Sequence, residues 1–189
     1  MRMRLLLKPK PRSAADSTLT DHSRFTTKWS APLMLEIPTE AVAPVTNNRA
    51  INQPYLLGHG TLECRDIAET RCFYEEFLGL ETVRHAAPAF AFRLGLKFHV
   101  FCVEVGDKIH DVSFLTHWGL DVRSREEVEA AYRAAHEHKD RYKIRQITEV
   151  TLQHGVYSFY LQDLDYNWWE FQYYEGFQDD DIFDFGDRF

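Results

Sequence analysis

Two histidines and one glutamate could together bind a metal ion in this chain of 189 residues. His59 lies in the sequence Gly-His-Gly, His117 lies in Thr-His-Trp-Gly, and Glu170 lies between aromatic residues near the carboxyl end. A carboxylate among Trp and Phe is costly to bury unless something pairs with it. Two imidazoles and one carboxylate form a facial ligand set that suits Fe(II) and leaves coordination positions open. The three residues therefore predict an iron site.

A predicted β-hairpin carries Glu170. Residues 157–162 and 167–174 have strand patterns, and the four residues between them are typical of a tight turn. Because side chains alternate along a strand, we expect Glu170 to share a face with Trp168 and Gln172.

His59 is expected on a strand over residues 56–64. Asp66 and Glu69 form a capping box after it, which predicts a helix that ends at Gly79. Three short strands are then predicted, over residues 81–85, 89–94 and 98–105.

The same order of elements follows His117. It is expected on a strand over residues 112–122, and Ser124 begins a second capping box and helix. Three further strands are predicted, over residues 144–152, 157–162 and 167–174. The repeat, with a period of about 58 residues, predicts an α+β fold of paired βαβββ modules that form a curved mixed sheet around the metal site. The modules span about 55–107 and 110–175, within one domain over residues 54–175.

The two ends of the chain differ from this domain. Residues 1–53 have little periodicity and predict an extended or partly disordered arm, which is an inactive extension or a packing or dimer-contact arm, with a transit peptide as the weaker alternative. Residues 176–189 combine aspartates with phenylalanines and predict an acidic-aromatic tail.

Composition excludes several classes of partner. The formal net charge of −7 and the isoelectric point near 5.7 disfavour nucleic acid, because phosphate binding needs clustered Lys and Arg. No apolar run reaches the roughly 20 residues that a membrane span needs. The three cysteines form no Cys-x-x-Cys pair, which favours a reducing compartment and predicts a cytoplasmic protein.

The segment Gly-His-Gly-Thr-Leu-Glu-Cys-Arg-Asp-Ile-Ala-Glu-Thr-Arg-Cys-Phe-Tyr-Glu-Glu-Phe-Leu-Gly-Leu-Glu, which begins at Gly58, resembles the opening strand and helix of the vicinal oxygen chelate superfamily. That superfamily includes glyoxalase I, extradiol ring-cleaving dioxygenases and antibiotic-resistance binding proteins. The resemblance extends over about residues 55–174. It implies that His59, His117 and Glu170 are the metal ligands.

The stretch from residue 154 to residue 170 resembles the extradiol dioxygenase pattern in particular. That pattern has a histidine, Phe-Tyr, an acidic residue, a turn and the Glu ligand, and its places are filled by His154, Phe159, Tyr160, Asp163 and Glu170. Leu164 and Tyr166 replace the usual turn Pro and Gly. Glyoxalase I has a fourth ligand, normally Glu, on the strand before the second metal histidine. The closest equivalent in this sequence is His99, which weakens the glyoxalase interpretation.

The resemblance implies an Fe(II)-dependent extradiol dioxygenase, with Mn(II) as the alternative metal, that inserts both atoms of O₂ into a catechol-type aromatic diol. His154 would act as acid and base, Tyr160 would hydrogen-bond a substrate oxygen, and His99 would line the O₂ side of the pocket. Structural roles for Tyr160 and His99 stay open. The alternatives are a glyoxalase-like lyase or isomerase that uses Ni, Zn or Co, and a metal-free protein that binds an aromatic compound. Modules of this kind also lead us to expect a homo-oligomer.

Overall fold

The computed structural model describes residues 51–52 and 56–174. Nearly all of the predicted amino-terminal arm and all of the predicted acidic-aromatic tail lie outside the described residues. The predictions for these two segments therefore stay predictions.

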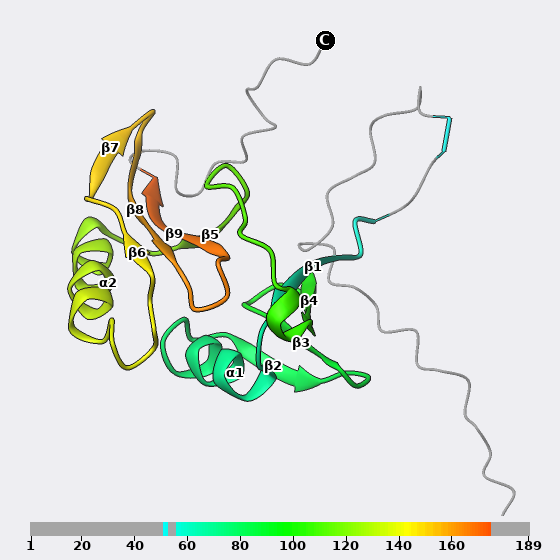
Figure 1. Cartoon of the computed structure of the whole chain (residues 1–189). Helices are drawn as coiled ribbons and strands as arrows, with labels where there is room; N and C mark the ends of the chain where they lie inside the picture. The colour runs from blue at the N-terminus through cyan, green and yellow to red at the C-terminus, as the bar shows by residue number, and fades with distance from the viewer. Residues whose placement is uncertain (1–50, 53–55, 175–189) are drawn as a thin grey trace, which may run out of the picture. The chain divides into compact units, whose positions relative to one another are not determined.

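The first module is a four-stranded sheet with one helix. Its sheet, the first sheet, has the order β1-β4-β3-β2, in which β1 pairs with β4 in parallel and the other pairs are antiparallel (Figure 1). The predicted helix cap is confirmed, because the Asp66 side chain accepts a hydrogen bond from the Glu69 backbone nitrogen at 2.9 Å. The elements are β1 (His59–Cys64), α1 (Ile67–Glu76), β2 (Glu81–Arg84), β3 (Ala89–Arg93) and β4 (His99–Glu104).

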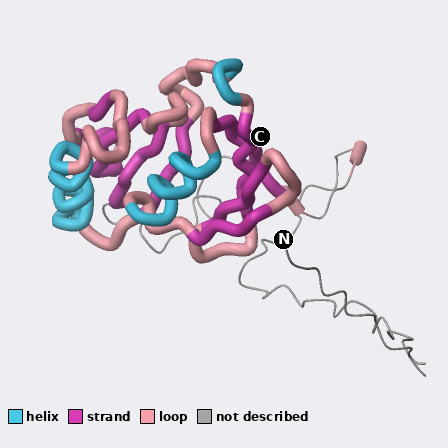
Figure 2. Tube along the Cα trace, turned by 60° about the horizontal axis from the view of Figure 1, so that its bottom comes forward, coloured by secondary structure: helices cyan, strands magenta, loops and turns pink. Residues whose placement is uncertain are grey.

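The second module repeats this plan. Its sheet, the second sheet, has the order β5-β9-β8-β6, with β5 parallel to β9 and a further short strand paired with β8. Figure 2 shows the helices and strands of both modules by colour. The predicted α+β fold of paired βαβββ modules is confirmed. The elements are β5 (His117–Asp121), α2 (Arg125–Glu137), β6 (Gln146–Ile147), β7 (Thr151–Gln153), β8 (Val156–Gln162) and β9 (Trp168–Tyr174).

Two predicted strands of the second module differ from the structure. The strand predicted over residues 112–122 begins only at His117, because the Thr116 nitrogen bonds to the Ser113 oxygen and closes a turn before it. The strand predicted over residues 144–152 is divided into β6 and β7. Between these two strands the Thr148 hydroxyl accepts the hydrogen bond of the Tyr160 backbone nitrogen, which interrupts the ladder.

The apolar faces of the two modules share one core. Tyr74 of α1 packs edge-on against Phe92 of the first sheet at 5.0 Å and against Trp169 of the second sheet at 5.2 Å. Both Tyr74 and Trp169 are at most 1% exposed. Edge-on aromatic pairs add about 0.5–1.5 kcal/mol to the energy of burial, so α1 stabilises both sheets.

The turn between β8 and β9 connects the modules through buried polar groups. The Asp163 carboxylate, which is fully buried, accepts hydrogen bonds from Tyr74 at 3.2 Å and from the Trp169 indole at 3.0 Å. The Asp165 carboxylate accepts from the Arg65 backbone nitrogen at 2.8 Å and from the Thr70 hydroxyl. Burial raises the pKa of Asp163 to about 6, although its hydrogen bonds from the Trp169 indole and from the Asp165 and Asn167 backbone nitrogens favour the charged form. The turn that delivers Glu170 to its place is therefore attached to the first module.

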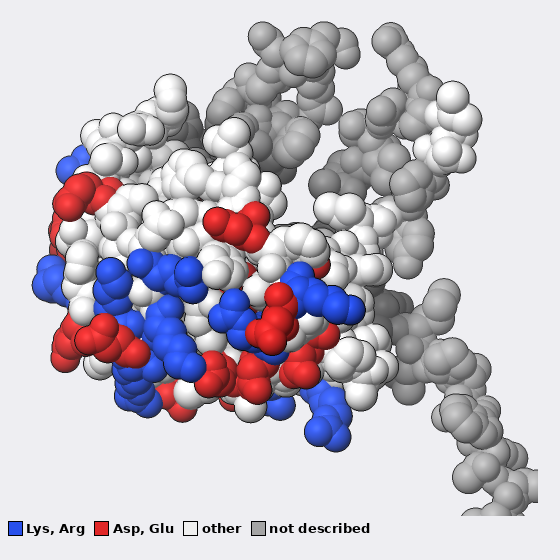
Figure 3. Space-filling model, viewed as in Figure 1, with Lys and Arg blue, Asp and Glu red and all other residues white. Residues whose placement is uncertain are grey.

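Surface charges of both signs also link the modules. Lys143 pairs with Glu69 and Arg141 pairs with Glu76, each at 2.7 Å and each between the second module and α1. On the face in Figure 3, Lys and Arg side chains lie among Asp and Glu side chains rather than in one basic patch. None of the described helices is long and apolar enough to cross a membrane.

Candidate metal-binding site

The structure brings His117 and Glu170 together on the second sheet. β5 and β9 run in parallel, with His117 opposite Trp168 and Gly119 opposite Glu170. The register places both side chains on the same face of the sheet. His117 Nε2 lies 3.4 Å from Glu170 Oε2, and Glu170 is only 6% exposed. The carboxylate that we expected to need a partner has one.

A backbone carbonyl fixes the proton on the His117 ring. His117 Nδ1 lies 3.1 Å from the Phe114 oxygen. Because a carbonyl can only accept a hydrogen bond, Nδ1 carries a proton and Nε2 of the neutral ring has its lone pair free. That lone pair and the carboxylate oxygen are both acceptors, so a metal cation bound between them would satisfy both atoms. Metal-binding histidines commonly use their second nitrogen in this way.

The separation of the two atoms fits a shared divalent ion. Two ligands that each lie about 2.1 Å from a metal are about 3.0 Å apart at the right angle of an octahedral site and about 3.4 Å apart at a tetrahedral angle. The observed separation of Nε2 and Oε2 is 3.4 Å. Imidazole and carboxylate are ligands that Fe, Zn and Mn accept. His117 and Glu170 are therefore suited to hold two positions of a metal.

Tyr160 lies next to this pair. It is the cross-strand neighbour of Glu170 on β8, and its ring is 5.1 Å from the His117 ring. Burial and a hydrogen bond to Glu170 raise the pKa of Tyr160 to about 12. The phenol therefore stays protonated near neutral pH and can donate a hydrogen bond at the site.

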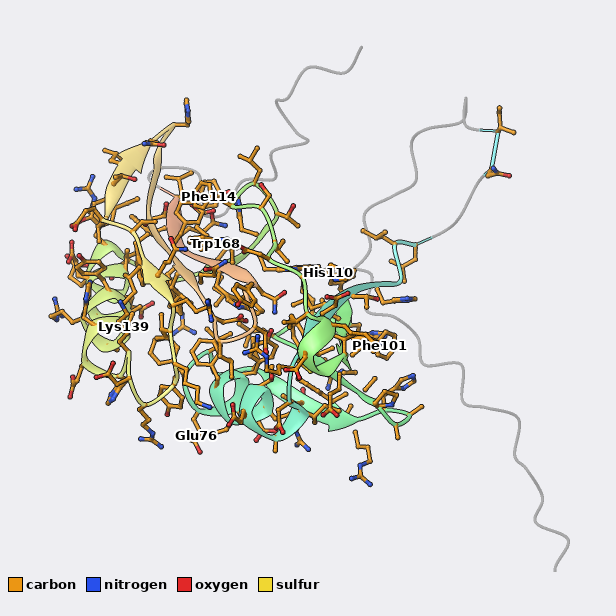
Figure 4. The ribbon with its side chains drawn as sticks, viewed as in Figure 1. Glu76, Phe101, His110, Phe114, Lys139 and Trp168 are labelled. Carbon is orange, nitrogen blue, oxygen red and sulfur yellow. The ribbon has the colours of Figure 1, made fainter. Side chains whose placement is uncertain are left out.

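An aromatic residue that the sequence analysis did not select also lies at the pair. The Phe114 ring is 4.6 Å from the Tyr160 ring and 5.2 Å from the Trp168 ring, and Figure 4 labels Phe114 and Trp168 close to each other. Phe114 was predicted inside a strand, where it would have been an ordinary core residue. The Ser113 hydroxyl accepts a hydrogen bond from the Leu115 nitrogen, as serine commonly does in turns. This serine is the sequence signal that could have predicted a turn at Phe114 before β5.

His59 is not brought to this pair. Its ring stacks on the His99 ring at 6.1 Å and meets Phe101 edge-on at 5.0 Å, all on the first sheet. Across residues 51–52 and 56–174, no three or more His, Cys, Asp or Glu side chains are placed to hold a metal ion. The expected convergence of His59, His117 and Glu170 is therefore not met by the part of the chain that the structure describes. Whether His59 is a ligand stays a prediction.

The first strands of the modules nevertheless approach each other. A Cβ atom at Gly60 would lie 2.6 Å from Cη2 of Trp118, so the indole of β5 lies against the backbone of β1. Gly60 follows His59 and shares the core face of β1 with Leu62, so this contact forms on the side opposite His59. The absence of a side chain at Gly60 makes room for the Trp118 indole.

His154 lies at the tip of a hairpin. It is exposed and, with a φ of 54°, forms the two-residue turn between β7 and β8 together with Gly155. Tyr160 is six residues further along β8, a span of about 20 Å at the rise of a strand. The structure therefore does not bring His154 to His117 and Glu170, and its predicted role as acid and base stays a prediction.

Comparison with known families agrees with the fold. The profile of the Glyoxalase/Bleomycin resistance protein/Dioxygenase superfamily matches residues 56–171, more than half of the chain. The chain belongs to this superfamily. No curated protein matches the chain.

Solved structures of this superfamily's fold are similar in shape but distant in sequence. The fosfomycin resistance protein FosX from Listeria monocytogenes has a TM-score of 0.53 and 18% identity, over 67% of this chain and 98% of that chain. The hypothetical protein SA1046 from S. aureus has a TM-score of 0.51 and 19% identity, over 65% and 95%. A possible glyoxalase from Bacillus cereus has a TM-score of 0.51 and 18% identity, over 62% and 98%. At these identities the likeness supports the fold alone.

The register of the parallel strand pairs shows which residues occupy equivalent places in the two modules. In the β1–β4 pair, Thr61 lies opposite Phe101. In the β5–β9 pair, Gly119 lies opposite Glu170. Since Thr61 follows His59 by two residues and Gly119 follows His117 by two, Phe101 occupies the place of Glu170 in the first module. His99, predicted as the closest equivalent of the glyoxalase carboxylate ligand, lies two residues before that place.

His99 lines a cavity on the first sheet. The cavity has a volume of about 350 Å³ and is lined in part by His85, His99 and Phe101, with Lys97 and Arg93. The described ring contacts of His99 are to His59 and Phe101. The predicted position of His99 beside the metal pair is not seen.

Proposed function

We propose that this chain is an Fe(II)-dependent extradiol dioxygenase that opens a catechol-type aromatic diol with O₂. The observation that carries the proposal is the His117–Glu170 pair, with Nδ1 on a backbone carbonyl and Nε2 at 3.4 Å from the carboxylate. When bound, Fe(II) supplies a Lewis acid with open positions for the two substrate oxygens and for O₂.

His59 is the residue of this chain that we propose as the third ligand. It precedes Gly60, and Trp118, which contacts Gly60, follows His117. The backbones of His59 and His117 therefore lie on strands that approach each other, each next to a residue of the Gly60–Trp118 contact. To bind a metal together with His117 and Glu170, the His59 ring would turn away from its stack on His99.

The register of the first module supports a ligand set of three rather than four. Phe101 occupies the place that is equivalent to Glu170, so the first module offers no carboxylate there. Phenylalanine cannot bind a metal. A set of two histidines and one glutamate leaves the coordination positions that a chelating diol and O₂ need.

Other residues of this chain would bind and orient the substrate. Tyr160, whose pKa of about 12 keeps it protonated, can donate a hydrogen bond to a substrate oxygen beside Glu170. The rings of Phe114 and Trp168 provide apolar surface next to His117. A flat aromatic diol matches a hydrogen-bond donor and aromatic rings at one site.

A second candidate function is a lyase or isomerase of the same superfamily. The observation in its favour is the position of His154 at the tip of the β7–β8 hairpin, which leaves the dioxygenase proposal without its expected acid and base. Such an enzyme would use Ni, Zn or Co at the same pair and would not need O₂.

Anaerobic metal loading followed by substrate tests distinguishes the two. The full chain is purified without air, its metal content is measured, and Fe(II) or Ni(II) is added. Oxygen uptake with a catechol and a yellow ring-fission product support the dioxygenase. Turnover of a hemithioacetal without uptake on any catechol supports the lyase. The absence of metal binding would overturn both proposals.

Two variants of equal charge change provide the control for this test. Glu170→Gln removes the proposed ligand, whereas Glu137→Gln changes an exposed carboxylate near the end of α2. We expect metal to be lost only from the first variant. Equal metal content in both would show that the ion binds elsewhere.

A further inference from the structure

The segment that joins the modules crosses the face of the second sheet that carries His117 and Glu170. The Asp111 carboxylate accepts a hydrogen bond from Gln162 at 3.0 Å, and the Val112 oxygen accepts from the Trp168 indole at 3.2 Å. Gln162 and Trp168 are buried on that face. Residues 111–114, which we call the linker, are therefore attached to the site at several points.

The linker is also attached to the first module. The His110 ring and backbone nitrogen bond to the Glu63 carboxylate of β1 at 2.8 and 3.1 Å. Figure 4 labels His110 near β1 and Phe114 near β5. The position of the linker is therefore set by both modules, and Phe114 at its end is held rather than free to swing.

Phe114 is fixed on one side and open on the other. Its ring meets Tyr160 edge-on at 4.6 Å and Trp168 edge-on at 5.2 Å, while 41% of the residue stays exposed. Its backbone oxygen holds the His117 ring. An aromatic face that is open to solvent and lies against the ring of a proposed metal ligand is suited to contact another ring.

We propose that Phe114 is a specificity-determining residue, and that its ring is the wall against which the aromatic ring of the substrate packs. This inference rests on the proposed function, because it needs a substrate bound at His117 and Glu170. The Phe114 carbonyl positions His117 whatever the side chain is, so the side chain can be removed without removing the contact that fixes the imidazole. The neighbouring Leu115 is 84% exposed and serves as the matched control.

The experiment measures binding of 4-nitrocatechol to the full chain loaded with Zn(II), which cannot react with O₂. Phe114→Ala should weaken binding about fivefold to tenfold, since it removes one aromatic contact. Phe114→Leu should have a smaller effect, and Leu115→Ala should have none. Zinc affinity should stay unchanged in all three variants, and circular dichroism should show that each is folded.

The possible outcomes separate the inference from the function on which it rests. If Phe114→Ala binds zinc and 4-nitrocatechol as the unchanged chain does, the inference is wrong and the proposed function stands. If the unchanged chain binds zinc but not 4-nitrocatechol, the inference and the catechol substrate are both overturned. If Phe114→Ala is unfolded, the affinity of Phe114→Leu for 4-nitrocatechol is the test. An affinity equal to that of the unchanged chain counts against the proposal.

Discussion

The two modules have the same order of elements but differ at the equivalent pairs of residues on their parallel strands. In the second module, His117 lies with a buried carboxylate, and its other nitrogen is bound to a carbonyl. In the first module, His59 stacks on His99 and meets Phe101, the residue in the place of Glu170. One module therefore has a histidine and a carboxylate that could bind a metal, and the other has rings and a cavity.

The difference shows that a repeated fold positions side chains without deciding their chemistry. Parallel pairing of the first and last strand of each module brings two residues of the same face together in both halves. A carboxylate at that place makes a ligand, and a phenylalanine makes a surface. The comparison can be tested by changing equivalent positions in the two modules.

The largest effect is expected at the metal pair. If His117 is a ligand, as we propose, His117→Ala should lower metal affinity more than about 100-fold, because the loss of a ligand costs more than the loss of a supporting hydrogen bond. His99→Ala, on the equivalent side of the first sheet, should change it less than about twofold. Isothermal titration with Zn(II) and Fe(II) measures both. A large loss in His99→Ala would mean that the first module holds the metal, against the comparison drawn above.

The β8–β9 turn should be much more sensitive to change than the corresponding β3–β4 loop. Asp163→Ala leaves the Tyr74 hydroxyl and the Trp169 indole without their acceptor inside the core. We expect a loss of about 3–5 kcal/mol in the free energy of unfolding. Leu96→Ala, in a loop residue that is 62% exposed, should lose less than about 1 kcal/mol. Urea unfolding measures both, and equal losses would contradict this prediction.

Stability should depend on pH through Asp163. Its pKa is about 6 in the folded chain and 3.8 in the ordinary state, so the folded chain binds the proton more tightly. The contribution of Asp163 to the free energy of unfolding is therefore fully present below about pH 4. It falls by about 3 kcal/mol as the pH rises through about 6. The difference in unfolding free energy between the unchanged chain and Asp163→Asn, measured across this range, isolates the group. A difference that stays constant with pH would contradict the prediction.

Glycines beside the two histidines should respond differently to alanine. At Gly60 a Cβ would lie 2.6 Å from a Trp118 ring atom, which packs in the core, and we expect a loss of about 1–3 kcal/mol. At Gly119 the nearest atom is the end of the Gln172 side chain at 2.7 Å, which can move, and the loss should be below about 1 kcal/mol. Thermal unfolding compares the two. A smaller loss at Gly60 would show that β1 and β5 do not depend on this contact.

The smallest effect is expected at His154. Asn accepts the left-handed backbone of this hairpin turn, so His154→Asn should leave stability within about 0.5 kcal/mol. The rate of catechol turnover by Fe(II)-loaded protein then tests the predicted acid and base directly. An unchanged rate excludes His154 from the reaction, and a large loss without a change in stability would restore the role that the sequence predicted.

Local patterns were sufficient for much of the fold. The Asp66 and Ser124 caps, the hairpin that carries Glu170 and the repeat of two modules were all predicted, because they depend on residues close in the sequence. The face shared by Glu170 and its neighbours on β9 follows from alternation along one strand. The strand predicted over residues 112–122 failed at its start, since the Thr116 nitrogen bonds to the Ser113 oxygen in a turn and the Val112 oxygen accepts from Trp168 of the distant hairpin.

What the sequence by itself determined is the superfamily and the types of residue that could bind a metal. Only the tertiary structure decided which of them meet. The 3.4 Å contact of His117 with Glu170 depends on the pairing of β5 with β9, the separation of His154 from it depends on the length of β8, and the place of Phe101 depends on the register of β1 with β4. These are contacts between segments far apart in the chain, and no local preference for helix, strand or turn specifies them.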